Sequence, residues 1–295
     1  GLTGVVLTEG CSQCRVTGST LQEGGAGGVR ITGGTDPETP ARHTHGNLVS
    51  GNKILRMGRR YLAGCGVLLM HGYENEISRN EIADLYYSGI SVGWIWGYAD
   101  SITRDNRIEQ NHIHHIGQGV LSDMGGVYLL GKQPGTVVNG NVIHDIKARF
   151  YGGWALYTDE GSSYITLENN ICYRTSETCY HQHYGSMNTV RNNIFVNSRE
   201  YMLRVSRQEL HLGLIFERNI ICCDNVPVYG PDFAGFPSRC IGAHHNLVFD
   251  VSNPEPVFFR YKDGRTLSLS DMQSLYNMEE GTVIADPGFV DSAKD

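Results

Sequence analysis

The 295-residue sequence predicts an all-β protein, a parallel β-helix in which short strands stack coil upon coil. Two observations indicate this fold. A short asparagine motif returns along most of the chain, and short apolar runs bounded by glycine-rich or polar turns accompany it. Because one coil cannot bury its apolar face alone, coils must stack, and equivalent residues of neighbouring coils then lie about 4.8 Å apart.

The repeated motif is Asn-x-Ile or Asn-Ile, with copies 23 to 35 residues apart. Its copies begin at Asn52, Asn80, Asn106, Asn141, Asn170, Asn193, Asn219 and, with Leu replacing Ile, Asn246. An asparagine repeated at one turn position predicts an internal ladder, in which each amide bonds to the turn of the next coil. The alternative is that these residues only favour turns.

The other strands of each coil are predicted from apolar runs that follow a turn. These runs are 66–69, 89–92, 119–121, 154–157 and 179–181. The pattern stops near residue 250, so we expect a β-helix over 1–250 and a capping segment over 251–295. Within the cap, residues 262–265 predict a hairpin turn, and Ser270-Asp271-Met272-Gln273 resembles a capping box that opens a short helix.

The composition of the chain limits the classes of molecule that it can be expected to bind. The net charge of −7 and the pI near 5.9 argue against nucleic acid or an anionic membrane and are compatible with a neutral carbohydrate. No apolar run approaches the ~18 residues of a membrane span. The eight cysteines are expected to be buried free thiols, and Cys11-x-x-Cys14 lacks the second pair that a zinc site would need.

The segment WALYTDEGSS (154–163) contains the candidate active-site acids. Aligning the coils predicts one column of side chains formed by Gly93, Asp123, Asp159 and His183, each from a successive coil. The neighbouring column is predicted to contain Trp94, Met124, Glu160 and Tyr184. Two carboxyl groups about 5 Å apart cannot both ionise easily, so one pKa should rise, and this spacing is typical of a retaining glycosidase.

Other interpretations of the acids stay open. Each aspartate precedes a glycine and is alone compatible with a turn residue. A metal site formed by Asp123, Asp159, His181 and His183 is the second alternative. We expect the residues around the acids to bind substrate, namely His181, His183, Tyr184, Trp94, Trp154, Arg204 and Arg207, although the arginines could instead pair with Glu200 and Glu209. The stretch 126–135 is expected to form a wall of the cleft.

Four segments resemble bacterial right-handed parallel β-helix carbohydrate-active enzymes. They are LSDMGGVYLLGKQPGT (121–136), YGGWALYTDEGSS (151–163), HQHYG (181–185) and NNIF (192–195), and the nearest group is glycoside hydrolase family 141, with family 120 sharing the fold. The resemblance implies a right-handed helix and a retaining-type glycosidase acting on plant cell-wall glycans such as xylan or fucose-containing chains. It assigns the acidic pair to Asp123 and Asp159.

Three functions therefore follow from the sequence. In a glycoside hydrolase, Asp159 is the expected nucleophile, and Asp123 or Glu160 protonates the leaving oxygen. No cofactor is expected, with Ca²⁺ as the alternative, and a secreted or periplasmic location is favoured. A polysaccharide lyase would instead use Arg204, Arg207, His183 and Tyr184 on a uronate-containing glycan. The third function is a non-catalytic glycan-binding β-helix.

Overall fold

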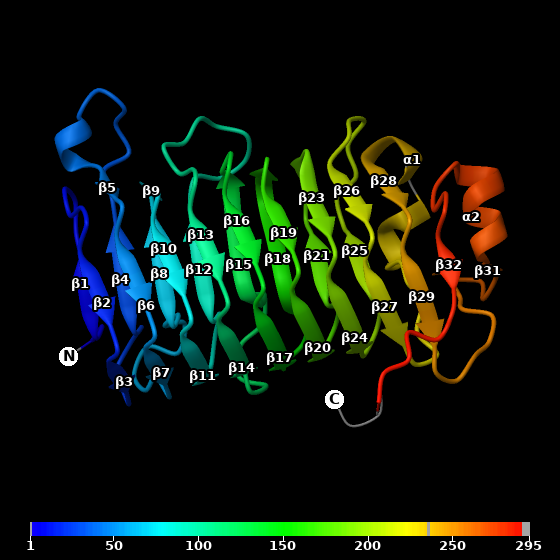
Figure 1. The fold of residues 1–295 in the computed structure, drawn as a ribbon, viewed down its shortest axis with the longest axis horizontal. Coiled ribbons are helices and arrows are strands. Elements are labelled where there is room, and N and C mark those ends of the chain that lie inside the picture. Colours follow the sequence, from blue (N-terminus) through cyan, green and yellow to red (C-terminus); the bar gives the residue numbers. More distant parts are fainter. Residues whose placement is uncertain (1, 235–236, 291–295) are drawn as a thin grey trace.

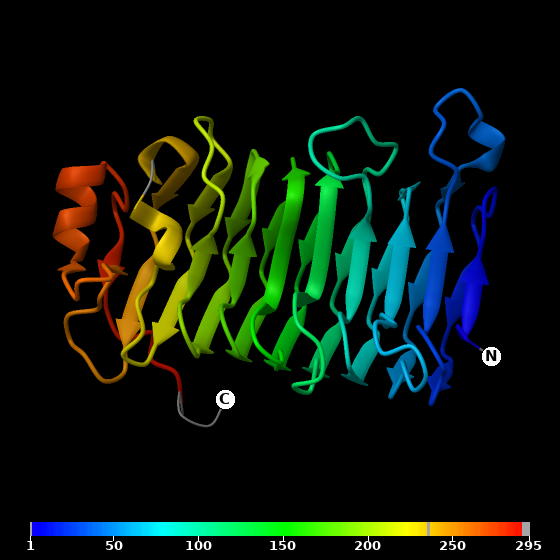
Figure 2. The same cartoon turned by 180° about the vertical axis from the view of Figure 1, so that it is seen from behind.

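The computed structural model of the chain describes residues 2–234 and 237–290. Three parallel sheets run along one long axis, and successive coils add one strand to each sheet (Figures 1 and 2). The structure is therefore the parallel β-helix that the sequence predicts. In the described residues, no helix combines the length and apolar character needed to cross a membrane.

Sheet 1 carries the candidate acids on its outer face. Its strands, in spatial order, are β1 (Val5–Leu7), β4 (Val29–Thr32), β8 (Val67–Met70), β12 (Ile90–Gly93), β15 (Met124–Lys132), β18 (Gly153–Ser163), β21 (Tyr180–Gln182) and β25 (Leu203–Val205), with β22 (Gly185–Ser186) also paired to β18. The strands β15 and β18 are longer than their neighbours, which extends this face beside the site.

Sheet 2 follows sheet 1 within each coil. Its strands are β2 (Arg15–Thr17), β6 (Leu48–Ser50), β10 (Glu76–Ser78), β13 (Arg107–Glu109), β16 (Val137–Asn139), β19 (Thr166–Glu168), β23 (Asn188–Arg191), β26 (Leu214–Glu217) and β28 (Ile241–His244). A small additional pair, β5 (Thr44–His45) and β9 (Gly72–Tyr73), lies outside the three sheets.

Sheet 3 completes the coil. Its strands are β3 (Thr20–Gln22), β7 (Lys53–Leu55), β11 (Glu81–Leu85), β14 (His112–Ile116), β17 (Val142–Ile146), β20 (Ile171–Thr175), β24 (Ile194–Ser198), β27 (Ile220–Cys223), β29 (Leu247–Asp250) and β32 (Val283–Ile284). Short helical turns η1 (Pro40–Arg42), η2 (Pro231–Ala234) and α1 (Pro237–Cys240) lie in the connections.

The core consists of apolar columns, one residue from each coil. In sheet 1, register pairs connect the fully buried residues Val67, Ile90, Val127, Leu156 and Tyr180. Sheet 3 has the equivalent column Ile54, Ile82, Ile113, Ile143, Cys172 and Phe195. Because each residue packs on its equivalents above and below, the hydrophobic effect holds the coils in register.

The predicted asparagine ladder is present between sheets 2 and 3. Its members, buried on eight coils, are Asn52, Asn80, Asn111, Asn141, Asn170, Asn193, Asn219 and Asn246. Each side-chain amide donates to the carboxamide oxygen of the next member over 2.9 to 3.2 Å. One prediction was wrong: Asn111, rather than Asn106, is the member on its coil.

Asn106 belongs to a second ladder that the motif search did not identify. The Asn47 side chain donates to Asn75, and that of Asn75 donates to Asn106. The Asn106 backbone amide then faces the Thr136 hydroxyl at 3.4 Å, so the asparagine series ends at that coil. Two asparagines in one coil explain why the Asn-x-Ile motif alone chose the wrong one.

The C-terminal region contains the predicted hairpin and helix. Strands β30 (Phe259–Arg260) and β31 (Thr266–Leu267) pair antiparallel, and helix α2 (Leu269–Tyr276) lies at the far end of the solenoid (Figure 1). The N-cap is Ser268 with Asp271 at N3, so the capping box begins two residues before the predicted Ser270. Strand β32 then returns to sheet 3 beside β29. The division at residue 250 stays a prediction, and residues 291–295 lie outside the described part.

The cysteines contribute to packing. None of the eight forms a disulfide; six are buried, whereas Cys11 and Cys14 are half-buried. Burial raises the pKa of the Cys179 thiol to about 11, which keeps it protonated at neutral pH. The prediction of buried free thiols holds for the six and not for the CxxC pair.

Candidate active site

A cavity of about 360 Å³ lies on the outer face of sheet 1, where the sequence predicts the active site. It is lined by Asp123, Tyr151, Trp154, Tyr157, Asp159, Glu160, His181, His183, Arg204 and Ser206. All three predicted catalytic carboxylates are among these residues, as are four of the predicted substrate-binding residues.

The predicted column of acids has the wrong register. Strand pairing aligns Asp159 with Leu130, and Leu130 with Gly93, whereas Asp123 immediately precedes β15. The run Met124–Leu130 is a strand rather than the turn that the glycines at 125 and 126 suggested, because Val127 and Leu129 face the core. The stretch 126–135 is therefore largely strand β15, and none of its residues is in the lining of the cavity.

Asp159 points outward from the middle of β18 and is only 8% exposed. The Tyr128 hydroxyl, from the preceding coil, donates to its carboxylate over 2.5 Å. Burial of the phenol and, next, the nearby Asp159 carboxylate raise the pKa of Tyr128, so the phenol stays a hydrogen-bond donor. This hydrogen bond fixes the position of the Asp159 carboxylate, because hydrogen bonds to a carboxylate are short and strong.

Asp123 has a different environment. Burial raises the pKa of its carboxyl group, and the charge of Asp159 raises it further. Hydrogen bonds from Tyr157 and Tyr151 and the charge of His183 act in the opposite direction. The net upward shift favours a protonated Asp123 beside an Asp159 whose carboxylate is hydrogen-bonded. This is the division that a general acid and a nucleophile require.

Tyr157 lies beside both acids. Its hydroxyl donates to the Asp123 carboxylate over 3.4 Å, and its strand β18 also carries Asp159. Burial and the charges of the two carboxylates raise the pKa of the Tyr157 phenol. Asp123 and Asp159 therefore line the same cavity although they occupy different register positions.

Two buried polar nitrogens in the cavity wall have no partner among the described atoms. They are Nε1 of Trp154 and Nδ1 of His181, on side chains that are each 2% exposed. The rings stack with centroids 4.2 Å apart. Burial, with a smaller contribution from the Arg204 charge, lowers the pKa of His181 well below its ordinary value, so the ring is neutral. Both nitrogens are closed off from solvent, and buried polar atoms without a partner are uncommon in folded proteins.

The two histidines meet at one hydroxyl. The Ser206 hydroxyl lies 2.8 Å from Nδ1 of His183 and 3.2 Å from Nε2 of His181. His183 follows β21 and its backbone N–H donates to Thr158, so its ring lies beside the Asp159 coil as predicted. Ser206 thus fixes the orientation of two rings that line the cavity.

Arg204 lines the cavity, but its guanidinium is occupied. It forms ion pairs with Glu177 at 2.5 Å and with Asp232 at 2.9 Å. Glu177 also accepts the Gly152 backbone N–H over 2.6 Å. The arginine therefore ties three coils together behind the site, and its partners differ from the predicted Glu200 and Glu209.

The remaining predicted residues flank the cavity. Trp94 stacks on Tyr128 at 5.7 Å, and Tyr184 reaches the Glu160 carboxylate at 3.4 Å. Arg207 lies over the Tyr184 ring and pairs with Glu209 at 3.5 Å, as the alternative interpretation expected. These residues form a shell around the acids and are absent from the lining.

The wall beside these residues comes from the connection between β12 and β13, the teal loop in Figure 1. The Gly97 backbone N–H donates to the Glu160 carbonyl, and the Tyr98 hydroxyl bonds to Glu209. Gly161 has φ +75°, and a Cβ there would lie 2.1 Å from the Gly97 carbonyl oxygen. Only glycine permits this close approach.

Sequence reasoning missed Tyr128, Tyr151, Tyr157 and Ser206. Tyr128 and Tyr157 occupy one register position with His181, so a correct alignment of β15 would have revealed them. For the metal alternative, no group of three or more His, Cys, Asp or Glu side chains in residues 2–234 and 237–290 is arranged to hold an ion. The expectation of no cofactor stays a prediction.

The family model described as Right handed beta helix region matches residues 41–221. No curated protein matches the chain. A solved structure titled "Glycoside hydrolase" is similar with a TM-score of 0.60 and 29% identity, covering 65% of this chain and 34% of that one. A surface adhesin of Streptococcus pneumoniae, PfbA, is similar with a TM-score of 0.43 and 12% identity, covering 91% of this chain and 64% of that one.

This chain spans about a third of the length of the solved glycoside hydrolase chain. The family match includes the coils that contribute Asp123, Asp159 and His183 to the cavity, and the parallel sheets are continuous through them. The chain therefore belongs to the family of right-handed β-helix proteins.

Proposed function

We propose that the protein is a glycoside hydrolase that cleaves glycosidic bonds with Asp123 and Asp159. The observation that carries the proposal is that two carboxyl groups from neighbouring coils line one cavity, where Tyr128 donates to Asp159 and Tyr157 donates to Asp123, whose pKa is raised. Such a pair of unlike carboxyls is what glycoside hydrolysis needs. The similar structure titled as a glycoside hydrolase supports the same reaction class.

The environments of the acids assign their roles. Asp159 is the nucleophile, because the Tyr128 hydrogen bond holds its carboxyl group in place at the cavity. Asp123 is the general acid, because its raised pKa keeps a proton available for the leaving oxygen. Glu160, whose carboxylate is held near Tyr184, is the alternative acid. A covalent intermediate on Asp159 followed by water attack gives retention of the anomeric configuration.

The cavity walls suit a neutral sugar. The Trp154 and Tyr157 rings supply apolar faces, and Glu160, His183 and Ser206 in the lining supply polar groups for sugar hydroxyls. With Arg204 paired twice, the cavity offers no free cation for a substrate carboxylate. We therefore propose a neutral unit of a plant cell-wall glycan, xylose or fucose, at the cleavage point.

The test is a panel of xylans, fucose-containing glycans and nitrophenyl glycosides. We expect new reducing ends from at least one of them, and NMR of the first product should show the anomer of the substrate. Asp84→Asn is the matched control for Asp159→Asn, because Asp84 is a half-buried aspartate on the outer face of sheet 3. Asp84 has φ 59°, which asparagine tolerates.

Two outcomes would overturn the proposal. Unsaturated uronate products, which absorb ultraviolet light, would establish a lyase. Binding of glycans without turnover on the whole panel would establish a non-catalytic glycan-binding protein. A first product with the opposite anomeric configuration would still establish a hydrolase. Asp159 would then activate a water molecule instead of attacking the sugar.

A further inference from the structure

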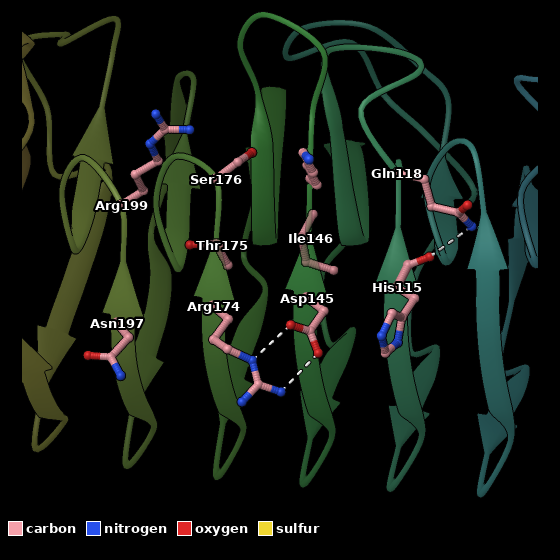
Figure 3. Close-up of a pocket in the computed structure, with 10 residues that line it drawn as sticks. His115, Gln118, Asp145, Ile146, Arg174, Thr175, Ser176, Asn197 and Arg199 are labelled. Carbon is pink, nitrogen blue, oxygen red and sulfur yellow. Dashed lines mark hydrogen bonds and ion pairs between the residues drawn. The ribbon is translucent and has the colours of Figure 1, made fainter. Parts of the chain in front are cut away.

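A second and larger cavity, of about 610 Å³, lies around the corner from the acids, at the C-terminal ends of the sheet 3 strands (Figure 3). We call it the lateral groove; its polar lining includes Asp145, Lys147, Arg174, Ser176, Asn197 and Arg199. Its lining residues lie at or just after the ends of four strands of successive coils, β14, β17, β20 and β24. The groove therefore runs along the solenoid axis and crosses four coils.

One register position supplies a row of polar side chains along the groove. The strand ends Ile116, Ile146, Thr175 and Ser198 are aligned, so the residues before them, His115, Asp145, Arg174 and Asn197, form this row. Their φ angles of 51° to 56° are left-handed, which turns these side chains to the outside of the coil. The row has the axial spacing of the coils, about 4.8 Å per step.

The groove carries an excess of positive charge in a protein whose net charge is −7. Arg174 and Asp145 point toward each other and form two contacts of 2.8 and 2.9 Å (Figure 3). Lys147 and Arg199 are exposed, and neither forms an ion pair with another described residue. Two cations are therefore available to an anionic ligand, one on each side of the Arg174 coil.

The loops that form the groove are the loops that form the active-site cavity. Gln118 and Asp123 lie in one connection, with the first at the groove and the second at the cavity. In the next connection, Lys147 likewise lies at the groove and Tyr151 at the cavity. The Ser176 hydroxyl accepts the backbone N–H of Ala148, which fixes that loop between the two sites.

We propose that the lateral groove binds an acidic oligosaccharide, a chain whose carboxylates meet Lys147 and Arg199. The sugar part of this proposal rests on the proposed function, whereas the anionic part rests on the charges of the groove. A row of imidazole, carboxylate, guanidinium and amide groups at regular spacing suits a polymer with a repeated unit. The negative net charge argues against a nucleic acid. The cleavage point would accept a neutral sugar and the groove an acidic stretch of the same glycan.

The experiment measures binding in the Asp159→Asn background, so that it does not depend on turnover. Calorimetry compares tetragalacturonate with xylotetraose for that protein, for Lys147→Ala/Arg199→Ala in it, and for Arg260→Ala/Lys262→Ala as a control. The control removes the same charge from two exposed positions in the C-terminal region. Thermal unfolding of all three checks that each is folded.

We expect tetragalacturonate to bind at least about tenfold more tightly than xylotetraose, and the groove variant to lose about tenfold in its affinity. The affinity of the control variant for tetragalacturonate should change by less than about twofold. Added salt should weaken the binding of tetragalacturonate and leave that of xylotetraose unchanged. Equal binding of both tetrasaccharides, or equal effects of the two variants, would overturn the proposal. Tighter binding of a sulfated tetrasaccharide would assign the groove to sulfate, and tighter binding of single-stranded DNA would remove the glycan assignment.

The two proposals fail separately. Loss of hydrolysis in all assays with intact, charge-dependent glycan binding would reject the hydrolase and keep the groove. Hydrolysis that depends on Asp123 and Asp159, with no charge-dependent binding, would reject the groove alone.

Discussion

The interior asparagine ladder and the cavity on sheet 1 both bury polar side chains on successive coils, but they satisfy hydrogen bonds differently. In the ladder, Asn141 donates to Asn170 and to a backbone carbonyl and accepts from Asn111. In the cavity, Trp154 and His181 each have a nitrogen without a partner among the described atoms. The ladder spends its polar groups on the fold, whereas the wall of the cavity holds buried polar atoms that the fold does not pair.

The ladder and the cavity also differ in the charge of their side chains. The ladder is neutral and its members are identical, so each coil adds the same contacts. The cavity brings two carboxyl groups together, which raises the pKa of Asp123 through burial and through the charge of Asp159. Such repulsion opposes folding at neutral pH, so a function is the more economical reason for its presence.

The largest expected effect is on catalysis. Asp159→Asn removes the nucleophile and should reduce kcat/KM on a hydrolysed glycan by about 10²- to 10⁴-fold, while the unfolding temperature stays near that of the parent. The Asp84→Asn control should keep full activity. Initial rates and thermal unfolding measure the two properties. Full activity in Asp159→Asn would contradict the assignment.

The second largest effect is on stability and concerns the asparagine ladder. Asn141→Ala leaves buried donors and acceptors of the ladder unpaired and should lower the free energy of unfolding by about 3 kcal/mol. Asn139→Ala, at a half-buried position two residues earlier, should cost less than about 1 kcal/mol. Urea unfolding compares them, and equal losses would show that the ladder is only a row of turn residues.

The third effect is a shift in pH dependence. A raised folded pKa means that the folded state binds this proton more tightly than the unfolded one. The stabilising contribution of Asp123 is therefore complete below 3.8, the ordinary pKa of an aspartate, and is lost as pH rises through the folded pKa. Activity that requires protonated Asp123 falls over the same range.

Tyr157→Phe removes a hydrogen bond that lowers the pKa of Asp123. The alkaline limb of the kcat/KM profile should therefore move to higher pH, and Tyr164→Phe, at an exposed position, should leave it in place. A movement to lower pH, or none, would remove Asp123 from the role of acid.

The smallest effect concerns the outer surface. Arg191 and Glu168 form an exposed ion pair at 2.7 Å on sheet 2. Arg191→Met should change the free energy of unfolding by no more than about 0.5 kcal/mol and leave activity unchanged, because solvent screens such pairs. A loss as large as that of Asn141→Ala would show that surface pairs, rather than the ladder, hold the coils together.

The sequence predicted features that repeat and misplaced features that do not. The apolar columns and seven of the eight ladder asparagines follow from periodicity, since every coil imposes the same demand on them. Asp123 was aligned wrongly because coil lengths vary at this site, and two glycines within β15 resemble a turn. Tyr157 and Tyr128 were missed because an outward tyrosine on one strand is identified as part of a site only when its neighbours across the sheet are known.

The most direct test of the central claim is a double-variant cycle on hydrolysis. If Asp123 and Asp159 act on one bond, the Asp123→Asn/Asp159→Asn enzyme should be about as slow as the slower single variant, because groups that act as a unit are not additive. A double variant whose loss equals the product of the two single losses would contradict a shared site, and so would a single variant with unchanged rate.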